Sequence, residues 1–149
     1  MTGPAHRVIG HKLFLPVVLV VSGAAAQFDE LLPAEEAFPC IAYAEGDSVV
    51  LSFQLPEGYY LYRHRFGFES LTDGIALEPP ELPDGRAHVD EFFGAVEIYR
   101  GDFEIRIPYR SPDGAGELQI RLDLQGCADI GYCYLPMSWD RRVRLPGDE

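Results

Sequence analysis

The chain has 149 residues, of which 47% are hydrophobic and 12% aromatic, a size and composition that suit one domain with a single core. Its formal net charge of −12 disfavours partners that carry phosphate groups, which excludes nucleic acid and anionic membrane surfaces as targets. We therefore expect one globular unit with no nucleic-acid partner.

Residues 1–26 have the order of a secretory signal, in which basic residues, an apolar run and small residues follow one another. We expect cleavage after Ala26, export to the periplasm and a mature domain over residues 27–149. The apolar run, residues 13–21, is shorter than the roughly 20 residues that span a bilayer. This disfavours the alternative, a retained membrane anchor, and we expect no direct membrane insertion of the mature chain. Cleavage would remove two basic residues and take the formal charge from −12 to −14.

The mature chain is expected to begin with a short helical turn at residues 34–37 and to continue as strands. After Cys40, apolar residues alternate with polar ones at a period of two, which is typical of β-strands with one buried face. The clearest alternating runs are Val49 to Leu55, Phe103 to Tyr109 and Leu118 to Leu124. Turn sequences rich in Pro, Asp and Gly separate such runs. This pattern predicts an all-β protein, an immunoglobulin-like antiparallel β-sandwich, with a small barrel as the alternative.

Cys127 and Cys133 flank five residues that include an Asp and a Gly suited to a tight hairpin. Directly opposed residues of an antiparallel pair lie about 4.5–5.5 Å apart at Cα, a distance that a disulfide can bridge. A bridge across so short a loop adds little to a hairpin that the sheet already holds. Two interpretations therefore stay open, a structural clip and a redox-active disulfide. If Leu118 to Leu124 alternate toward the core, the opposite parity of Cys127 places the pair outside the main core.

Aromatic residues are dense around the cysteines and in two other segments. Tyr132 and Tyr134 flank Cys133, Tyr59–Tyr62 holds three tyrosines, and Asp90–Gly94 holds two phenylalanines. For one aromatic residue alone, core packing is the simpler interpretation. Three such segments together favour a site around the cysteines.

Four segments, taken in order, resemble the periplasmic N-terminal domain of the thiol:disulfide interchange protein DsbD. They are Tyr59–Arg63, Asp90–Gly94, Glu97–Arg100 and Gln125–Tyr134, and the resemblance extends over essentially the whole mature chain. It implies an immunoglobulin-like domain that accepts electrons from a thioredoxin-like domain and passes them to periplasmic disulfide isomerases and related thiol proteins. Because the sequence stops at residue 149, we expect the thioredoxin-like donor domain on a separate chain.

The resemblance also implies roles for individual residues. Cys127 and Cys133 would be the redox pair, with Cys133 forming the mixed disulfides, and no cofactor other than this disulfide is implied. A cap loop would shield the disulfide, mainly through Phe92, until a partner displaces it. The implied loop and lining residues are Asp90, Glu91, Phe92, Phe93 and Gly94 in the cap loop, and Tyr60 and Tyr62 along the site.

Other polar and sulfur-bearing residues have simpler interpretations. Cys40 fits a buried small side chain better than a third redox centre. Asp129 could accept a proton beside Cys127, but a bond to its own turn is favoured. His64 and His88 are the only histidines after residue 26, which disfavours a zinc site, and we expect no metal.

The acidic residues Asp90, Glu91 and Asp129 are expected to raise the thiol pKa values, since no lysine or helix N-terminus is available to lower them. We therefore expect slow exchange that depends on a partner. Leu135 stands where the family commonly has proline, a departure outside the chemistry. The alternative function is a non-enzymatic immunoglobulin-like binding module with a structural hairpin disulfide.

Overall fold

The computed structural model of the protein describes residues 1–3, 30–112 and 114–147. The expected signal peptide falls almost wholly outside these residues, as does its cleavage site, so both stay predictions. Within the described ranges, no helix has the length and apolar character that crossing a membrane requires. The contacts divide the chain into two units, Met1–Glu30 and Leu31–Glu149, and the second holds every helix and strand described below.

The second unit is built from short strands, as the alternating pattern predicts. One helical turn, α1 (Ala34–Ala37), precedes them, and one 3-10 turn, η1 (Arg63–Arg65), interrupts them. The strands are β1 (Cys40–Glu45), β2 (Ser48–Gln54), β3 (Tyr59–Tyr62), β4 (Gly67–Ser70), β5 (Ala76–Leu77), β6 (Arg86–Asp90), β7 (Gly94–Tyr99), β8 (Asp102–Arg110), β9 (Glu117–Leu124), β10 (Gly126–Ala128), β11 (Tyr132–Cys133) and β12 (Met137–Arg144).

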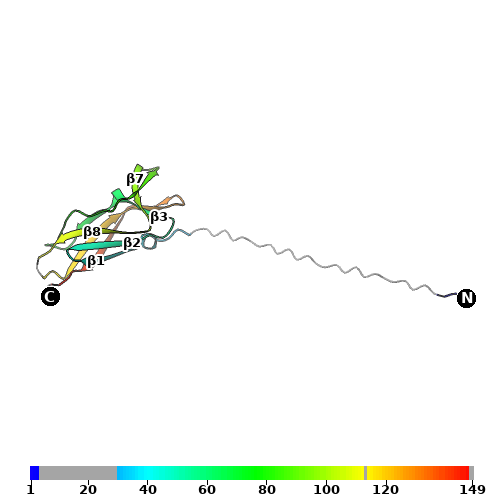
Figure 1. The fold of residues 1–149 in the computed structure, drawn as a ribbon, viewed down its shortest axis with the longest axis horizontal. Helices are drawn as coiled ribbons and strands as arrows, with labels where there is room; N and C mark the ends of the chain where they lie inside the picture. The colour runs from blue at the N-terminus through cyan, green and yellow to red at the C-terminus, as the bar shows by residue number, and fades with distance from the viewer. Residues whose placement is uncertain (4–29, 113, 148–149) are drawn as a thin grey trace. The chain divides into compact units, whose positions relative to one another are not determined.

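Three antiparallel sheets assemble from these strands (Figure 1). The first has the order β1-β2-β8-β5, and the second has the order β12-β9-β4. The third, β11-β10-β3-β7-β6, contains Cys127 and Cys133. Every described strand pair is antiparallel, and the predicted immunoglobulin-like antiparallel β-sandwich is confirmed.

The main core is formed mainly by apolar side chains of the first two sheets. Each such side chain, when fully buried, stabilises the fold by about 1.5–3 kcal/mol relative to exposure. The strand residues that form it include Val49, Leu51, Phe53, Ile105, Ile107, Leu118, Ile120, Leu122, Leu124 and Val143. The three alternating runs seen in the sequence therefore do line the core.

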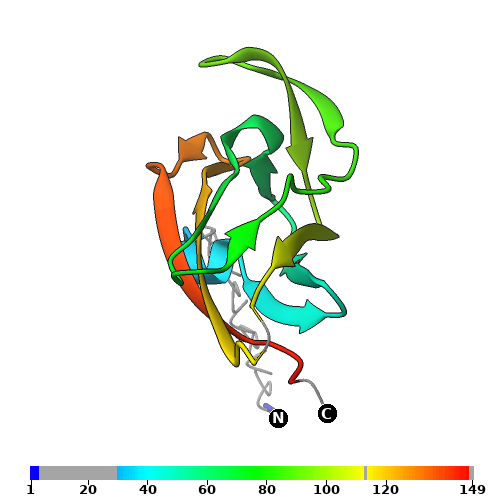
Figure 2. The same ribbon diagram turned by 90° about the vertical axis from the view of Figure 1, so that its left-hand side faces the viewer.

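The chain changes sheets at Gln125, between β9 in the second sheet and β10 in the third. This change delivers the cysteines to the end of the sandwich. Figure 2 shows the β10–β11 hairpin (orange) and the β6–β7 hairpin (green) at the same end, the upper one in that view. We call residues 126–133 the cysteine hairpin and residues 90–94, the tip of the β6–β7 hairpin, the cap loop.

Candidate active site

The cysteine hairpin places Cys127 directly opposite Cys133, with their Cα atoms 4.0 Å apart, and the two form a disulfide. The expected pairing is confirmed. Gly131 closes the turn with φ of +93°, a conformation that glycine adopts without a steric penalty. The hairpin pairing is short, because only Ala128 opposite Tyr132 adds to the cysteine pair.

Strand β10 lies unusually close to its neighbours at Gly126. A Cβ atom at this position would lie 2.3 Å from the carbonyl oxygen of Tyr60 and 2.7 Å from the ring of Phe38. Such contacts exclude any side chain, so only glycine lets the backbone approach here. The residue before Cys127 is thus fixed between β3 and the segment that follows α1.

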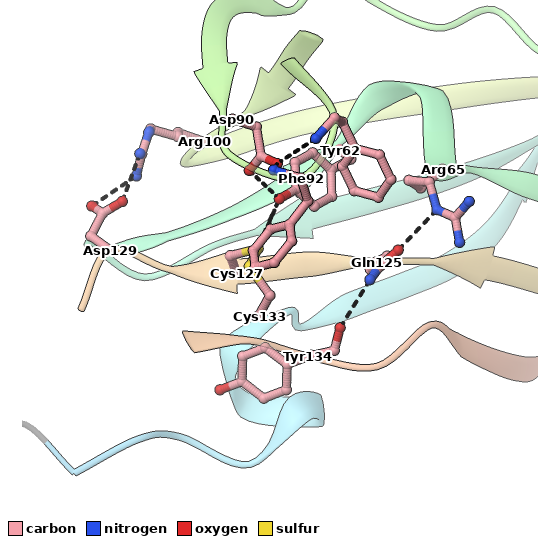
Figure 3. The surroundings of a disulfide bond; sticks show 11 residues. Tyr62, Arg65, Asp90, Phe92, Arg100, Gln125, Cys127, Asp129, Cys133 and Tyr134 are labelled. Carbon is pink, nitrogen blue, oxygen red and sulfur yellow. Dashed lines mark hydrogen bonds and ion pairs between the residues drawn. A yellow bond between two sulfur atoms is a disulfide. The ribbon is translucent and has the colours of Figure 1, made fainter. Parts of the chain in front are cut away.

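Tyr134, the residue after Cys133, anchors the other strand of the hairpin at its base. Its amide donates to Gly126 O at 2.9 Å, and its hydroxyl donates to Leu32 O at 2.5 Å. Gln125 Nε2 donates to Tyr134 O at 3.2 Å, as Figure 3 shows. The Tyr134 ring packs edge-on against Phe38, with centroids 5.0 Å apart. The N-terminal segment of the domain therefore supports both ends of the disulfide loop from below.

Asp129 ties down the tip of the cysteine hairpin, but not in the way expected. Its carboxylate accepts two hydrogen bonds from Arg100, at 3.0 and 2.8 Å, instead of bonding its own turn, so that prediction is wrong. Its amide donates to Gly58 O at 2.8 Å. A bidentate arginine with a nearby carboxylate offers a stronger interaction than a turn bond, which explains the difference.

The disulfide lies outside the main core, as the strand parity predicts. Cys127 belongs instead to a small buried cluster with Tyr60, Tyr62 and Ile98, and it is only 1% exposed. Lying outside the main core does not expose Cys127 to solvent, because aromatic side chains cover that face of the third sheet. Cys133 is half-buried and is the more accessible of the two.

Tyr62 joins the disulfide to the cap loop. Its hydroxyl donates to Asp90 Oδ2 at 2.5 Å, and the same oxygen lies 3.0 Å from Cys127 Sγ and 3.8 Å from Cys133 Sγ (Figure 3). Burial raises the pKa of Tyr62 well above its ordinary value, and the hydrogen bond to Asp90 raises it further. The phenol therefore keeps its proton at any physiological pH and acts as a hydrogen-bond donor.

Asp90 holds the cap loop in place from within. Its Oδ1 accepts hydrogen bonds from the amides of Phe92 and Phe93, at 2.7 and 2.9 Å, while Oδ2 accepts the Tyr62 hydroxyl. The side chain is nearly buried. Burial alone would raise the pKa of Asp90, but these three hydrogen bonds and nearby His88 outweigh it and lower the pKa below the ordinary value.

The two phenylalanines of the cap loop have different surroundings. Phe93 packs edge-on against Tyr62 and His64, with centroids 5.1 and 5.0 Å away. Phe92 is 67% exposed, and its ring is drawn in front of the sulfur atoms in Figure 3. A hollow of about 280 Å³ separates the cap loop from the cysteine hairpin and is lined by Phe92, Asp90 and Cys133, among others.

The structure brings most of the expected site residues together. Tyr60 and Tyr62 lie against Cys127, and the cap loop closes over the same end of the third sheet. Glu91 is exposed on that loop, and Gly94 ends it where β7 begins. Their roles in exchange stay predictions.

Cys40 is remote from this site, at the start of β1. It forms no disulfide among the described residues, and burial raises the pKa of its thiol to about 12. The thiol is therefore protonated near neutral pH, which agrees with the structural interpretation. In the described part of the chain, no three His, Cys, Asp or Glu side chains gather as a metal site.

Three contacts at the site were not foreseen from the sequence. They are the Arg100 pair with Asp129, the Tyr134 bond to Leu32 and the tight approach at Gly126. Arg100 and Gly126 stand within the segments that carry the family resemblance, which was the one available signal. The residues of each pair are far apart in sequence, so no local pattern links them.

Known proteins are similar to this chain over nearly the whole folded unit. The family model described as the N-terminal part of the thiol:disulfide interchange protein DsbD matches residues 28–145. Thiol:disulfide interchange protein DsbD 2 of Pseudomonas aeruginosa is 40% identical over 130 residues, which cover 87% of this chain and 20% of that protein. The chain spans about a fifth of the length of the curated relatives that it matches.

Two solved structures from Neisseria meningitidis are similar as well. The DsbD N-terminal domain in its reduced form has a TM-score of 0.70 and 29% identity, covering 80% of this chain and 94% of that one. A complex between the DsbD N-terminal and PilB N-terminal domains gives a TM-score of 0.64 and 30% identity, covering 76% and 87%. Because the family model matches residues 28–145, most of its length, the chain belongs to the family of DsbD N-terminal domains.

Proposed function

We propose that the chain is a thiol-disulfide exchange domain that works in the periplasm. The Cys127–Cys133 pair takes electrons from a thioredoxin-like donor domain and passes them to disulfide isomerases or related thiol proteins. Family membership supports the chemistry, and the disulfide is the sole redox group that the proposal needs. The exported location rests on the signal-like order of residues 1–26.

The observation that carries the proposal is the position of the disulfide. It bridges a hairpin that hydrogen bonds already hold at base and tip, through Tyr134 and Asp129. A clip is not needed there, since a closed loop this short gains little from a covalent bond. Meanwhile the more accessible residue, Cys133, lines a hollow that a partner can enter. This arrangement is expected of a redox-active disulfide.

The exchange steps follow from the difference in exposure. A donor thiolate attacks Cys133 Sγ, a bond forms between the two sulfurs, and the Cys127–Cys133 bond breaks with its electron pair leaving on Cys127. A second donor thiolate then attacks the donor sulfur of this mixed disulfide, which oxidises the donor and leaves the chain as a dithiol. Toward an acceptor the order reverses, with Cys133 attacking and Cys127 resolving.

Tyr62 gives the cap loop a second role beyond shielding. While the loop is closed, the phenolic proton is directed to Asp90, and a thiolate forming on Cys127 would face the phenol oxygen at 3.0 Å and a nearby carboxylate. That arrangement disfavours the leaving thiolate. When Asp90 moves away with the loop, the hydroxyl is free to donate to Cys127 Sγ, which stabilises the leaving group.

The docking face surrounds Cys133. Exposed apolar side chains lie on the cysteine hairpin (Ile130 and Tyr132), two residues after Cys133 (Leu135) and on the cap loop (Phe92). Exposed apolar groups around a polar centre are typical of protein interaction sites. The Neisseria complex of DsbD N-terminal and PilB N-terminal domains is a precedent for a protein partner of this fold.

The test measures both potential and transfer in a Cys40→Ala background. We expect a reduction potential above about −300 mV in glutathione buffers, because structural disulfides usually lie below that value. Oxidised protein mixed with a reduced thioredoxin-like domain should then gain two alkylatable thiols, assigned to Cys127 and Cys133 by mass spectrometry. A lower potential with no gain of thiols would support the structural clip instead.

A further inference from the structure

Arg100 lies at the turn between β7 and β8 and connects the tip of the cysteine hairpin to Tyr60 on β3. Its guanidinium binds both carboxylate oxygens of Asp129 at the tip of the cysteine hairpin. The same guanidinium lies over the ring of Tyr60, 4.8 Å from its centroid. Tyr60 is the residue on β3 that pairs with Cys127.

These contacts form a continuous stack beside the sulfur atoms. The Tyr60 ring packs edge-on against Tyr62, with centroids 5.6 Å apart, and Tyr62 touches Cys127. Arg100 therefore holds the turn of the hairpin against the strand beside Cys127. Its fork of donors matches a carboxylate at two points, which fixes orientation as well as distance.

We propose that Arg100 is a positioning residue that keeps the cysteine hairpin closed while the Cys127–Cys133 bond is broken. The inference rests on the proposed exchange at this disulfide. Once the bond opens, β11 is left with a two-residue pairing to β10, and the tie at Asp129 keeps the turn in place. The two sulfurs then stay within reach of each other, which favours reclosure.

Removal of Arg100 is therefore expected to shift the equilibrium between disulfide and dithiol toward the dithiol. Two glutathione molecules reduce the disulfide and become glutathione disulfide, while the chain gains two thiols. Without Arg100 the reduced hairpin gains conformational freedom that the bridged hairpin does not. Reduction therefore becomes more favourable, and the effective concentration of one thiol at the other falls.

The test compares Arg100→Gln with Arg121→Gln in the Cys40→Ala background. Arg121 binds both oxygens of Asp140 at 2.9 and 3.2 Å on the second sheet, so the control removes another two-point arginine–aspartate pair away from the disulfide. We expect Arg100→Gln to raise the equilibrium constant for reduction by glutathione about fivefold, the equivalent of one partly exposed ion pair. Arg121→Gln should leave this constant unchanged.

Two further variants test which features of the Arg100–Asp129 ion pair the effect depends on. Asp129→Asn keeps the size of the side chain and should shift the constant in the same direction, even if Arg100→Gln were to fold poorly. Arg100→Lys keeps the charge but offers one ammonium group instead of a fork, so its constant should lie between those of wild type and Arg100→Gln.

Several results would overturn the inference. They are a wild-type constant in Arg100→Gln and Asp129→Asn, an equal shift in Arg121→Gln, or a full wild-type value in Arg100→Lys. Because glutathione is the only reductant, the outcome does not depend on any protein partner. A failure of the proposed donor reaction is therefore distinguishable from a failure of the role given to Arg100.

Discussion

The two hairpins at the disulfide end of the sandwich are held in opposite ways. The cysteine hairpin has a buried strand, Gly126–Ala128, and is tied at its base by Tyr134 and at its tip by Arg100. The β6–β7 hairpin is exposed along most of its length, and its tip is held mainly through Asp90 and the ring of Phe93. More contacts thus hold the hairpin that carries the sulfurs than hold the loop beside it.

Each hairpin also uses one aspartate, in a different environment. Asp129 is half-exposed and meets the positive charge of Arg100. Asp90 is buried and accepts its hydrogen bonds from neutral donors, two amides and a phenol. An ion pair at the surface survives small displacements, whereas three convergent hydrogen bonds are lost together when a loop moves. The difference suits one aspartate to a permanent tie and the other to a release.

The first prediction concerns the cysteine hairpin and has the largest effect. In the Cys40→Ala background, Cys127→Ser should accumulate a mixed disulfide with a thioredoxin-like partner, at least about tenfold more than Cys133→Ser does. The reason is exposure, since Cys127 is buried and Cys133 lines the hollow. Non-reducing gels with mass spectrometry of the linked peptide measure it. Equal or reversed trapping would contradict the assigned roles.

The second prediction releases the cap loop. Asp90→Ala removes all three hydrogen bonds of the carboxylate and should raise the rate of disulfide reduction by a water-soluble phosphine about tenfold. Glu117→Ala is the control, because Glu117 is an exposed carboxylate on β9 outside the site, and its rate should not change. If both variants react at the wild-type rate, the cap loop does not limit access.

The third prediction is that low pH releases the cap loop reversibly and raises the rate of disulfide reduction by less than Asp90→Ala does. Because the folded-state pKa of Asp90 is lowered, its charge stabilises the closed loop above the ordinary value of 3.8, and this support is lost as pH falls through the folded-state pKa. Phosphine reduction, corrected for phosphine protonation, should therefore accelerate only below that ordinary value. Asp90→Asn should show no such step. An identical step in that variant would point to another group.

The fourth prediction removes the shield without releasing the loop. Phe92→Ala should raise the rate of reduction by dithiothreitol about threefold with little loss of stability, since the ring is 67% exposed and contributes little buried area. Ile41→Ala, an exposed apolar residue on β1, serves as the control. Equal rates in Phe92→Ala and wild type, with the fold intact by circular dichroism, would count against a capping role.

The smallest effect is expected at the base of the cysteine hairpin. Tyr134→Phe loses the hydroxyl bond to Leu32 O and should lower the free energy of unfolding by about 1 kcal/mol in urea titrations. Tyr132→Phe, on the exposed side of Cys133, should lower it by much less. Similar losses in both variants would show that the Leu32 contact is not a specific support.

The sequence predicts the sandwich well because the alternation of apolar and polar residues along a strand shows which side chains are buried. Leu118, Ile120, Leu122 and Leu124 alternate strictly, and all four are buried in the main core. The same parity places Cys127 on another face, but it carries no information about what covers that face. Tyr60 and Tyr62 cover it only because β3 pairs with β10, a contact between segments more than sixty residues apart.

The site is predictable to the extent that its residues stand in recognisable segments. The cysteine pair, the cap loop and the tyrosines of β3 were found this way, whereas the partner of Asp129 was not. A hairpin Asp can bond its own turn or any cation that the fold brings near, and sequence alone favours the local option. Asp129 binds Arg100 instead of its own turn because the turn between β7 and β8 lies beside the hairpin tip.

The tight approach at Gly126 sets limits on redesigning the site. Any substitution there would push β10 away from Tyr60 and Phe38, so the position before Cys127 offers no freedom for engineering. The spacing between the cysteines could be varied only on the far side, in the turn after Ala128, where Gly131 has open space around it. A library that samples new cysteine spacings on this scaffold should therefore keep residues 126–128, the carboxylate of Asp129 and a glycine at the positive-φ position constant, and vary the length of the turn between them.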